Sequence, residues 1–390
     1  VVANENGIYV NGGHFINSNG VTLTTGNVKV DGKNVNFNIT NSNNGEVFID
    51  EKGVALFGEK KGTLNKEAPY FNIISRTMEI VGPIETPNQE LNLIAGKNEV
   101  KLANNKVDIL NSDKTGTSEK EHAIKASFLG SMYGPDIKLI ATEKGVGISH
   151  EGLISATKGI DINSNGDISL SLVKSNKDLK IKGSGNLTTV YSNEANIIKH
   201  PTNSRLDQTL KSQLSSKGNI EIDMENNIDL NTVVSAEGDI KITGNNMKVG
   251  GRDGGIKTND NIDISLSGKL TTEAQKILKN AGFEITEVHI KIDPETGKKT
   301  YLNEKGKDIT ANVEESEILK DTIKSKNIVI SANEIENNTG IAITNEIDIK
   351  SKENLYNSGK IKGNIIEINA DRLNNNKENI LENSGNINAT

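Results

Sequence analysis

A short unit of alternating apolar and polar residues recurs along this chain about every 20 residues. Its clearest copies are "KGNIEID" (217–223), "EGDIKIT" (237–243) and "NDNIDIS" (259–265). Their first isoleucines, Ile220, Ile240 and Ile262, are 20 and 22 residues apart. Side chains alternate between the two faces of a strand, so each copy predicts a strand with one buried face. A unit that returns at this interval predicts a solenoid.

Further copies show how one strand leads to the next. The same unit recurs in "KGIDIN" (158–163), "NGDISLSL" (165–172), "KDLKIKG" (177–183) and "KNIVIS" (326–331). In "LYNSGKI" (355–361) and "LENSGNI" (381–387), an Asn-Ser-Gly triplet separates two apolar residues. Asn and Gly tolerate positive φ, which favours a tight corner between strands. About 18 stacked coils, roughly 4.8 Å apart, would form a rod on the order of 80 Å long.

Composition agrees with a long and narrow core. Hydrophobic residues are 34% of the chain, aromatic residues are 3%, and Trp is absent. A β-sandwich array is the alternative all-β architecture, but sandwiches usually have aromatic core anchors. The net charge of −7 leaves no basic footprint for nucleic acid, and no stretch approaches the roughly 18 apolar residues of a membrane span. Zero Cys excludes disulfides and thiolate metal sites.

One segment departs from the repeat. In "TTEAQKILKNAGF" (271–283), apolar residues have helical spacing between a possible Thr cap and Gly282, which predicts a helix. "EVHIKIDPETGKKTYLNEKG" (287–306) predicts a hairpin that turns at "DPETG". We therefore expect residues 271–323 to form an excursion from the rod, made of a helix and a hairpin.

No pattern of catalytic or metal-binding residues emerges. The histidines are far apart in sequence, and exposed or corner positions are expected for them: His14, His122, His150, His200 and His289. The glycine cluster "GNNMKVGGRDGGIK" (244–257) lacks the Gly-Lys-Ser/Thr ending of a phosphate loop and predicts a wide corner. Aspartates at similar strand positions could stack across coils, with Lys241 and Lys248 relieving their repulsion: Asp161, Asp167, Asp223, Asp229, Asp239 and Asp263. A calcium ladder would need six to eight oxygen ligands in tight loops at each ion, so a charged outer face is the favoured interpretation.

Long stretches of the chain resemble a known family. They are "VVANENGIYVNGGHFINSNGVTLTTG" (1–26), "GPIETPNQELNLIAGKNEV" (82–100) and "AIKASFLGSMYGPDIKLIATEKGVGISHEGLISA" (123–156). They resemble the secretion domain of two-partner-secretion exoproteins, the filamentous-haemagglutinin and CdiA-like family. The tail "LYNSGKIKGNIIEINADRLNNN" (355–376) is similar to that family's haemagglutinin repeats. The resemblance implies a right-handed parallel β-helix.

The resemblance also implies partners and a secretion motif. Members are exported through an outer-membrane TpsB-type transporter, whose periplasmic domains recognise the secretion domain. The family's Asn-Pro-Asn-Gly-Ile motif falls on Asn4, Glu5, Asn6, Gly7 and Ile8, with Glu5 in place of Pro. A turn tolerates this exchange, because Pro only presets a φ that many residues adopt. The companion Asn-Pro-Asn-Leu motif is absent, so we expect the secretion domain to lack its first part.

These observations lead to one set of expectations. The fold is an all-β, right-handed parallel β-helix with an extra-helical helix-and-hairpin excursion. The regions are the C-terminal part of a secretion domain (1–157), β-helix repeats (158–270), the insertion (271–323) and haemagglutinin-type repeats (324–390).

The expected function is that of a secreted or cell-surface adhesin without enzymatic activity, cofactor or metal. It would bind the transporter and a host or bacterial cell-surface receptor or glycan, and would have no nucleic-acid partner and no membrane span. Two alternatives stay open, namely the stalk of a contact-dependent growth-inhibition toxin and a polysaccharide-active β-helix enzyme.

Overall fold

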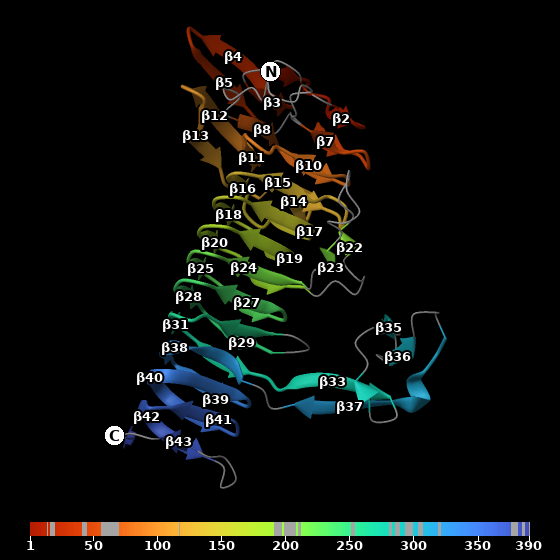
Figure 1. Cartoon of the computed structure of the whole chain (residues 1–390). Coiled ribbons are helices and arrows are strands. Elements are labelled where there is room, and N and C mark those ends of the chain that lie inside the picture. The colour runs from red at the N-terminus through yellow and green to blue at the C-terminus, as the bar shows by residue number, and fades with distance from the viewer. Residues whose placement is uncertain are drawn as a thin grey trace.

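One 33-stranded sheet dominates the computed structural model and winds into a rod (Figure 1). Its strands pair in parallel with those of the neighbouring coils, which makes the fold a parallel β-helix and confirms the predicted class. The structure describes residues 1–13, 15, 20–40, 45–55, 70–116, 118–190, 197–198, 208–209, 212–250, 254–280, 283–284, 289–292, 299–302, 307–318, 321–375, 381–383 and 387–389.

The rod has three faces, each a stack of parallel strands. The first face contains β1 (Val2–Ala3), β3 (Val21–Thr24), β8 (Tyr70–Ser75), β11 (Glu90–Ala95), β16 (Ile137–Ala141), β18 (Ile160–Ser164), β20 (Leu179–Gly183), β25 (Ile220–Met224), β28 (Ile240–Gly244), β31 (Asn261–Leu266), β38 (Asp321–Ala332), β40 (Gly340–Asn357), β42 (Ile365–Asn375) and β44 (Ile387–Ala389).

The second face contains β2 (Ile8–Val10), β6 (Glu46–Ile49), β9 (Thr77–Ile80), β14 (His122–Ala126), β17 (Gly147–Ala156), β19 (Ile168–Ser175), β21 (Leu187–Thr189), β26 (Ile228–Leu230), β29 (Met247–Val249), β32 (Lys269–Thr272) and β39 (Glu334–Asn337). The third face contains β7 (Val54–Ala55), β10 (Ile84–Glu85), β15 (Met132–Gly134), β24 (Gln213–Ser216), β27 (Val233–Ala236), β30 (Gly255–Lys257), β41 (Lys360–Gly363) and β43 (Leu381–Asn383). β17, β19, β38 and β42 are long enough to turn a corner and serve two faces, and β40 serves all three.

The alternating repeats build the core as the sequence predicts. Ile220, Ile240 and Ile262 stack in register and are at most 1% exposed. The same column continues to Val21 at one end and to Ile366 at the other. Burial of apolar surface at every coil contributes about 25 cal/mol per Å² to stability. This column contains a single aromatic residue, Phe71.

The first face holds fewer coils than the roughly 18 expected from length alone. The difference arises because some segments leave the rod. β4 (Asn27–Asp31), β5 (Asn34–Asn38), β12 (Lys97–Ala103) and β13 (Lys106–Asp113) form an antiparallel sheet in the order β13-β12-β5-β4. β22 (Ile197–Ile198) pairs with β23 (Gln208–Thr209) in a second excursion.

The four-stranded sheet packs on the rod through its own small core. Phe37, Val100 and Leu102 pack with Ile74 and Ile94 from the first face. Where this sheet leaves the rod, the guanidinium of Arg76 makes two hydrogen bonds to Glu143 (3.2 and 2.9 Å), and the Glu143 side chain is 1% exposed. A buried pair of this kind holds a junction because loss of either partner leaves a charge without compensation.

The predicted helix within 271–283 is wrong. The predicted hairpin is confirmed as a pair of strands, and its predicted turn at "DPETG" (293–297) lies outside the described residues. Residues Gln275–Asn280 form strand β33, which pairs antiparallel with β37 (Val313–Ile318) and β34 (Phe283–Glu284). A short helix is marginal, so pairing with a distant strand overrides helical spacing. Thr272 is therefore not a helix cap, and its hydroxyl donates to Asn337 Oδ1 (2.8 Å) inside the core.

The excursion projects from the rod. β33 and β37 lead away from it, and the hairpin β35 (His289–Ile292) with β36 (Lys299–Leu302) lies beyond them (Figure 1). The strands from 275 to 318 are outside the large sheet, and Ala281 and Gly282 lie outside the described residues. The domain boundaries drawn from the sequence stay predictions.

The Asn-Ser-Gly corner is present between β40 and β41. The amides of Ser358 and Gly359 both donate to the carbonyl of Asn337 (2.9 Å each), and a Cβ on Gly359 would overlap the carbonyl oxygen of Thr339. In the core beside it, Asn337 Nδ2 donates to Asn357 Oδ1 (2.8 Å). The buried amide is therefore satisfied by the coil next to it.

Replacing a column residue should cost far more than replacing its outward neighbour. We expect Ile222→Ala to lower the free energy of unfolding by about 2–5 kcal/mol, because it opens a cavity in a fully buried column. Glu221→Ala, one residue away on the exposed face, should change it by less than about 0.5 kcal/mol. Urea unfolding of both variants checks this, and equal losses would contradict the alternation.

Candidate functional site

The residues predicted as a secretion motif form a tight corner in the first coil, called here the N-terminal corner (Asn4–Ile8). The amide of Gly7 donates to the carbonyl of Asn4 (3.1 Å), which closes a β-turn. The amide of Asn6 donates to Asn4 Oδ1 (3.1 Å). Asn4 also donates its own amide to the carbonyl of Thr24 in the next coil (3.0 Å). Asn4 is thus the residue that both shapes the turn and joins it to the rod.

Glycines allow the N-terminal corner to lie against the coil beside it. Gly7 has φ +122, and a Cβ there would meet the carbonyl oxygen of Glu46 at 3.1 Å. Gly45 lies directly against the turn, because a Cβ at Gly45 would overlap the backbone of Glu5, Asn6 and Gly7. The sequence alone did not single out Gly45, since its role depends on contact across coils.

The side chains of the corner are largely open to solvent. Asn4, Glu5 and Asn6 are exposed, and Gly7 and Ile8 are partly buried. Ile8 is in register with Val47, so it begins the aliphatic column of the second face. The next residue, Tyr9, points outward and stacks on Phe48 with ring centroids 5.6 Å apart, and its hydroxyl donates to Asp50. The corner is therefore an ordered turn that presents polar groups.

Position 5 should accept the proline of the family motif. Glu5 is the second residue of the turn, and its amide donates to no described residue. We expect Glu5→Pro to raise the free energy of unfolding by about 0.4–1 kcal/mol, because proline restricts the unfolded chain. Asn6→Pro should destabilise, since it removes the bond to Asn4 Oδ1. Chemical denaturation distinguishes the two, and a destabilising Glu5→Pro would contradict this geometry.

The histidines do not assemble into a site within the described part of the chain. His150 lies where β17 turns between two faces, so the predicted corner position is right, but the side chain is 1% exposed. Its Nδ1 lies 3.2 Å from the carbonyl oxygen of Gly152, and no described residue is bonded to its Nε2. Burial lowers the pKa of His150 to about 4. His122 is partly buried in β14, the side chain of His289 is not described, and His14 and His200 lie outside the described residues.

The buried imidazole makes stability depend on pH. His150 is in register with Ala126 and Leu170 in an aliphatic column, so it stays neutral in the folded rod. Between its ordinary pKa of 6.5 and about 4, the unfolded chain binds a proton that the folded chain does not. The contribution of neutral His150 to the free energy of unfolding is therefore intact above pH 6.5 and is lost as the pH falls toward 4.

We expect this residue to account for about 3 kcal/mol of the stability lost over that interval. His150→Leu should flatten the pH dependence by the same amount, while Lys174→Ala, an exposed residue of the neighbouring strand β19, should leave it unchanged. Unfolding measured from pH 7 to pH 4 tests this. A pH dependence that is equally steep in His150→Leu would contradict a buried neutral histidine.

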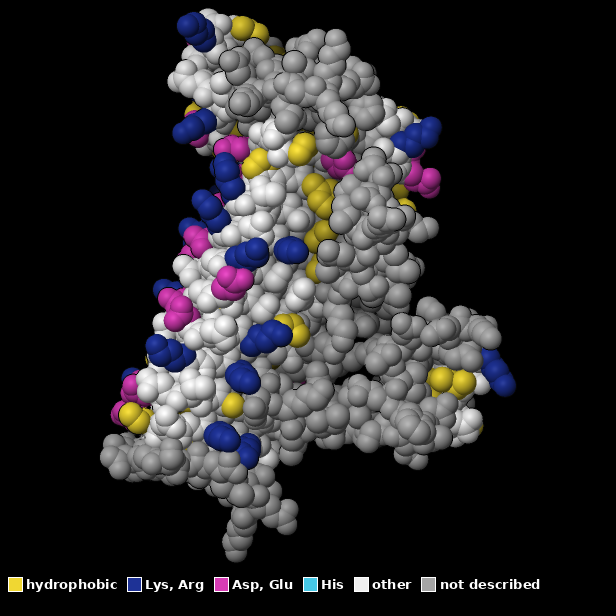
Figure 2. Space-filling model, in the orientation of Figure 1, with side chains coloured by type: hydrophobic (Ala, Val, Ile, Leu, Met, Phe, Trp, Pro, Cys, Tyr) yellow, Lys and Arg dark blue, Asp and Glu magenta, His cyan; other side chains and the backbone are white. Residues whose placement is uncertain are grey.

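The acidic side chains do not form the stacked ladder that the sequence suggested. On the first face, outward lysines and acids alternate in register from coil to coil: Lys138, Asp161, Lys180, Glu221, Lys241 and Asp263. Figure 2 shows the two signs interspersed along the rod. As predicted, Lys241 separates two acids, and Lys248 is in register with Asp229 and pairs with Glu273 (3.0 Å). Asp223 pairs with Lys182 (2.9 Å).

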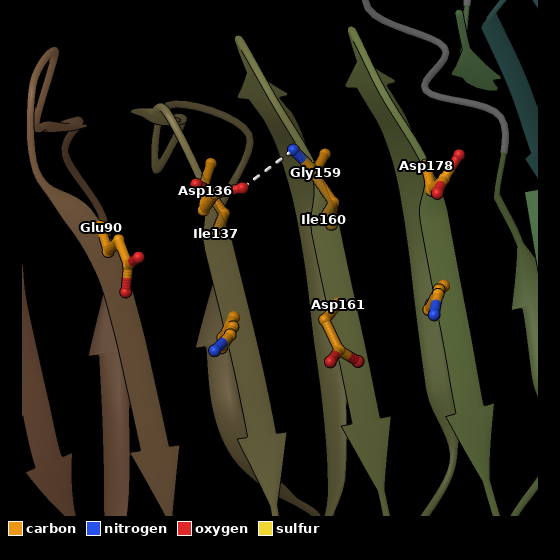
Figure 3. Close-up of a pocket in the computed structure, with 9 residues that line it drawn as sticks. Glu90, Asp136, Ile137, Gly159, Ile160, Asp161 and Asp178 are labelled. Carbon is orange, nitrogen blue, oxygen red and sulfur yellow. Dashed lines mark hydrogen bonds between the residues drawn. The ribbon is translucent and has the colours of Figure 1, made fainter. Parts of the chain in front are cut away.

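Aspartates at the corners join one coil to the next. Figure 3 shows Asp136, Gly159 and Asp178 just before β16, β18 and β20, three successive strands of the first face, and Asp136 Oδ1 accepts the amide of Gly159 (3.1 Å). Asp178 Oδ1 likewise accepts the amide of Asn219 (2.9 Å), and Asp167 Oδ1 that of Asn186 (2.7 Å). Asp239 does the same for Asn261 (3.2 Å). These carboxylates have a structural use in the corners.

Two absences apply to the described residues alone. No group of three or more His, Asp or Glu side chains there could hold a metal ion. No helix there has the length and apolar character needed to cross a membrane.

In the glycine-rich segment 244–257, β29 and β30 flank a corner in which the amide of Gly254 donates to the carbonyl of Gly250 (3.1 Å). The bond between Gly250 and Gly254 confirms the predicted corner, and residues 251–253 within it lie outside the described part of the chain.

Comparison with known proteins points to one group. The sequence profile of the family "TPS: TPS secretion domain" matches residues 1–170. The chain is 28% identical over 190 residues to "Filamentous hemagglutinin" of Bordetella pertussis, covering 47% of this chain and 5% of that protein. It is 32% identical over 160 residues to "Toxin CdiA" of Yersinia pestis, covering 41% and 4%. The chain thus spans about a twentieth of the length of these relatives.

A solved structure is also similar. The "Crystal structure of filamentous hemagglutinin secretion domain" is 23% identical, covers 57% of this chain and 62% of that chain, and superposes with a TM-score of 0.37.

Proposed function

We propose that residues 1–170 of this chain are a TPS secretion domain and that the chain is a segment of a secreted or cell-surface filamentous adhesin. In this proposal an outer-membrane two-partner transporter exports the chain, and the periplasmic domains of the transporter recognise the secretion domain. The profile match is the observation that carries the proposal. The exposed Asn4–Asn6 turn supports it, because an ordered polar corner in the first coil is available to such a partner.

The architecture supports progressive folding during export. Each coil pairs only with its neighbours, so a coil folds once the preceding coil is in place. The chain contains no Cys, so no disulfide locks it before it crosses the membrane. Folding outside the cell then draws on the burial of each successive set of column residues. In this proposal the chain acts by attachment and performs no chemistry.

Export can be tested with a matched pair of glycine variants. The chain is directed to the periplasm of cells that carry or lack the transporter encoded with it, and the medium is assayed for the chain. We expect transporter-dependent release, reduced severalfold by Gly45→Ala, because the new Cβ overlaps Glu5 and displaces the N-terminal corner. Gly13→Ala, where the Cβ meets only Val10 at 3.8 Å, should be released normally. Release that does not depend on the transporter would contradict the proposal.

Attachment needs a separate measurement. The purified chain should bind host or bacterial cells saturably, measured by flow cytometry and competed by unlabelled chain. The match to "Toxin CdiA" favours a second candidate, in which this chain is the stalk of a growth-inhibition toxin. Under that candidate the full-length protein inhibits neighbouring cells in coculture. Absence of saturable binding together with inhibition by the full-length protein would favour the stalk over the adhesin.

A further inference from the structure

The four-stranded excursion sheet has an open edge at β4. β4 is the last strand in the order β13-β12-β5-β4 and pairs only with β5 among the described strands. Figure 1 shows it at the N-terminal end of the molecule, with β5 and the rod on its other side. An open edge offers a row of unpaired backbone donors and acceptors that can accept another strand.

The hairpin register determines which residues face that open edge. β4 and β5 flank a two-residue loop, with Asp31 opposite Asn34. In such hairpins the residues that flank the loop exchange hydrogen bonds, and the next pair does not. Lys29 and Asp31 therefore bond toward β5, whereas the N–H and C=O groups of Val28 and Val30 point to the open edge.

The same two valines are exposed on the apolar side of the sheet. Val28 lies opposite Phe37, which is fully buried, and Val30 lies opposite Val35, which is partly buried. Their side chains share the face that packs on the rod, yet Val28 is 38% and Val30 is 68% exposed. The apolar layer thus continues past the part of the sheet that the rod covers.

Charge determines which strand fits this edge. Lys29 lies between the two valines on the opposite, solvent face and makes no ion pair with a described residue. Opposite charges across neighbouring strands stabilise a sheet, and like charges destabilise it. A strand with two aliphatic residues that flank a carboxylate would therefore cover both valines and neutralise Lys29.

A second copy of the chain fits less well. Antiparallel pairing that covers both valines places Lys29 against Lys29 of the second copy, which is repulsive. Pairing centred on Val30 places Lys29 against Asp31 of the second copy but leaves Val28 opposite a glycine, Gly32. Each self-pairing therefore loses either a charge match or an apolar contact.

We propose that the β4 edge (Asn27–Asp31) is a docking site for an extended strand of another protein that carries an acidic residue between two aliphatic residues. Main-chain hydrogen bonds from Val28 and Val30 hold the strand, their side chains supply apolar contact, and Lys29 selects the acidic residue. This interaction surface goes beyond the proposed function and does not depend on export or adhesion.

A labelled peptide tests the proposal directly. The probe is fluorescein-labelled Ser-Thr-Val-Glu-Val-Thr-Ser, titrated with the chain and followed by fluorescence anisotropy. We expect saturable binding that Val30→Lys weakens about fivefold to tenfold, through lost apolar contact and added charge. The control is Leu110→Lys on β13, at the other edge of the same sheet, where Leu110 is 54% exposed. It should leave binding unchanged, and equal melting temperatures establish that both variants fold.

Charge reversal tests the selectivity. Lys29→Glu should weaken binding of the acidic peptide and favour the matched peptide Ser-Thr-Val-Lys-Val-Thr-Ser. The proposal is overturned if the acidic peptide does not bind, or if Val30→Lys and Leu110→Lys have equal effects. It is also overturned if Lys29→Glu leaves the preference unchanged. Sedimentation that reveals dimers abolished by Val30→Lys would assign the edge to a second copy and overturn the proposal as well.

Discussion

In-register stacking of parallel strands from coil to coil is the constraint on which the rest of this molecule depends. It satisfies the backbone groups of each coil through its neighbours, and it places one apolar residue over another along every face. A slip of one residue would turn a whole column toward water, so the register is strongly specified. Because every coil adds the same kind of contact, the rod needs no large aromatic centre.

Polar groups follow the same register. Inside the rod, Asn92 donates to Asn72 and Asn72 donates to Thr22, so buried amides pair along the axis as the aliphatic residues do. On the surface, corner aspartates accept amides from the following coil, and lysines alternate with acids on the first face. Residues that suggest chemistry in a linear sequence thus acquire structural roles once the coils are stacked.

The sequence predicts the rod well because its repeat carries local and periodic information. Isoleucines such as Ile220 and Ile240 alternate with charged residues, and this identifies both the strands and their buried faces. Other features depend on contacts that no local pattern records. The strand at Gln275–Asn280 looks helical until its pairing with β37 is known, and the burial of His150 and Glu143 depends on neighbouring coils. The turn at Asn4–Gly7 was predictable in kind, but its fit against Gly45 was not.

The register can be measured directly because the chain has no cysteine of its own. Glu221 and Lys241 are outward-facing partners in adjacent strands, at a separation that a disulfide can bridge. The double variant Glu221→Cys/Lys241→Cys should form an intramolecular disulfide under mild oxidation, detected by its mobility without reductant. The shifted pair Glu221→Cys/Thr243→Cys should not, since two residues of offset exceed the reach of the bond. Equal cross-linking of both pairs, or of neither, would contradict stacking in this register.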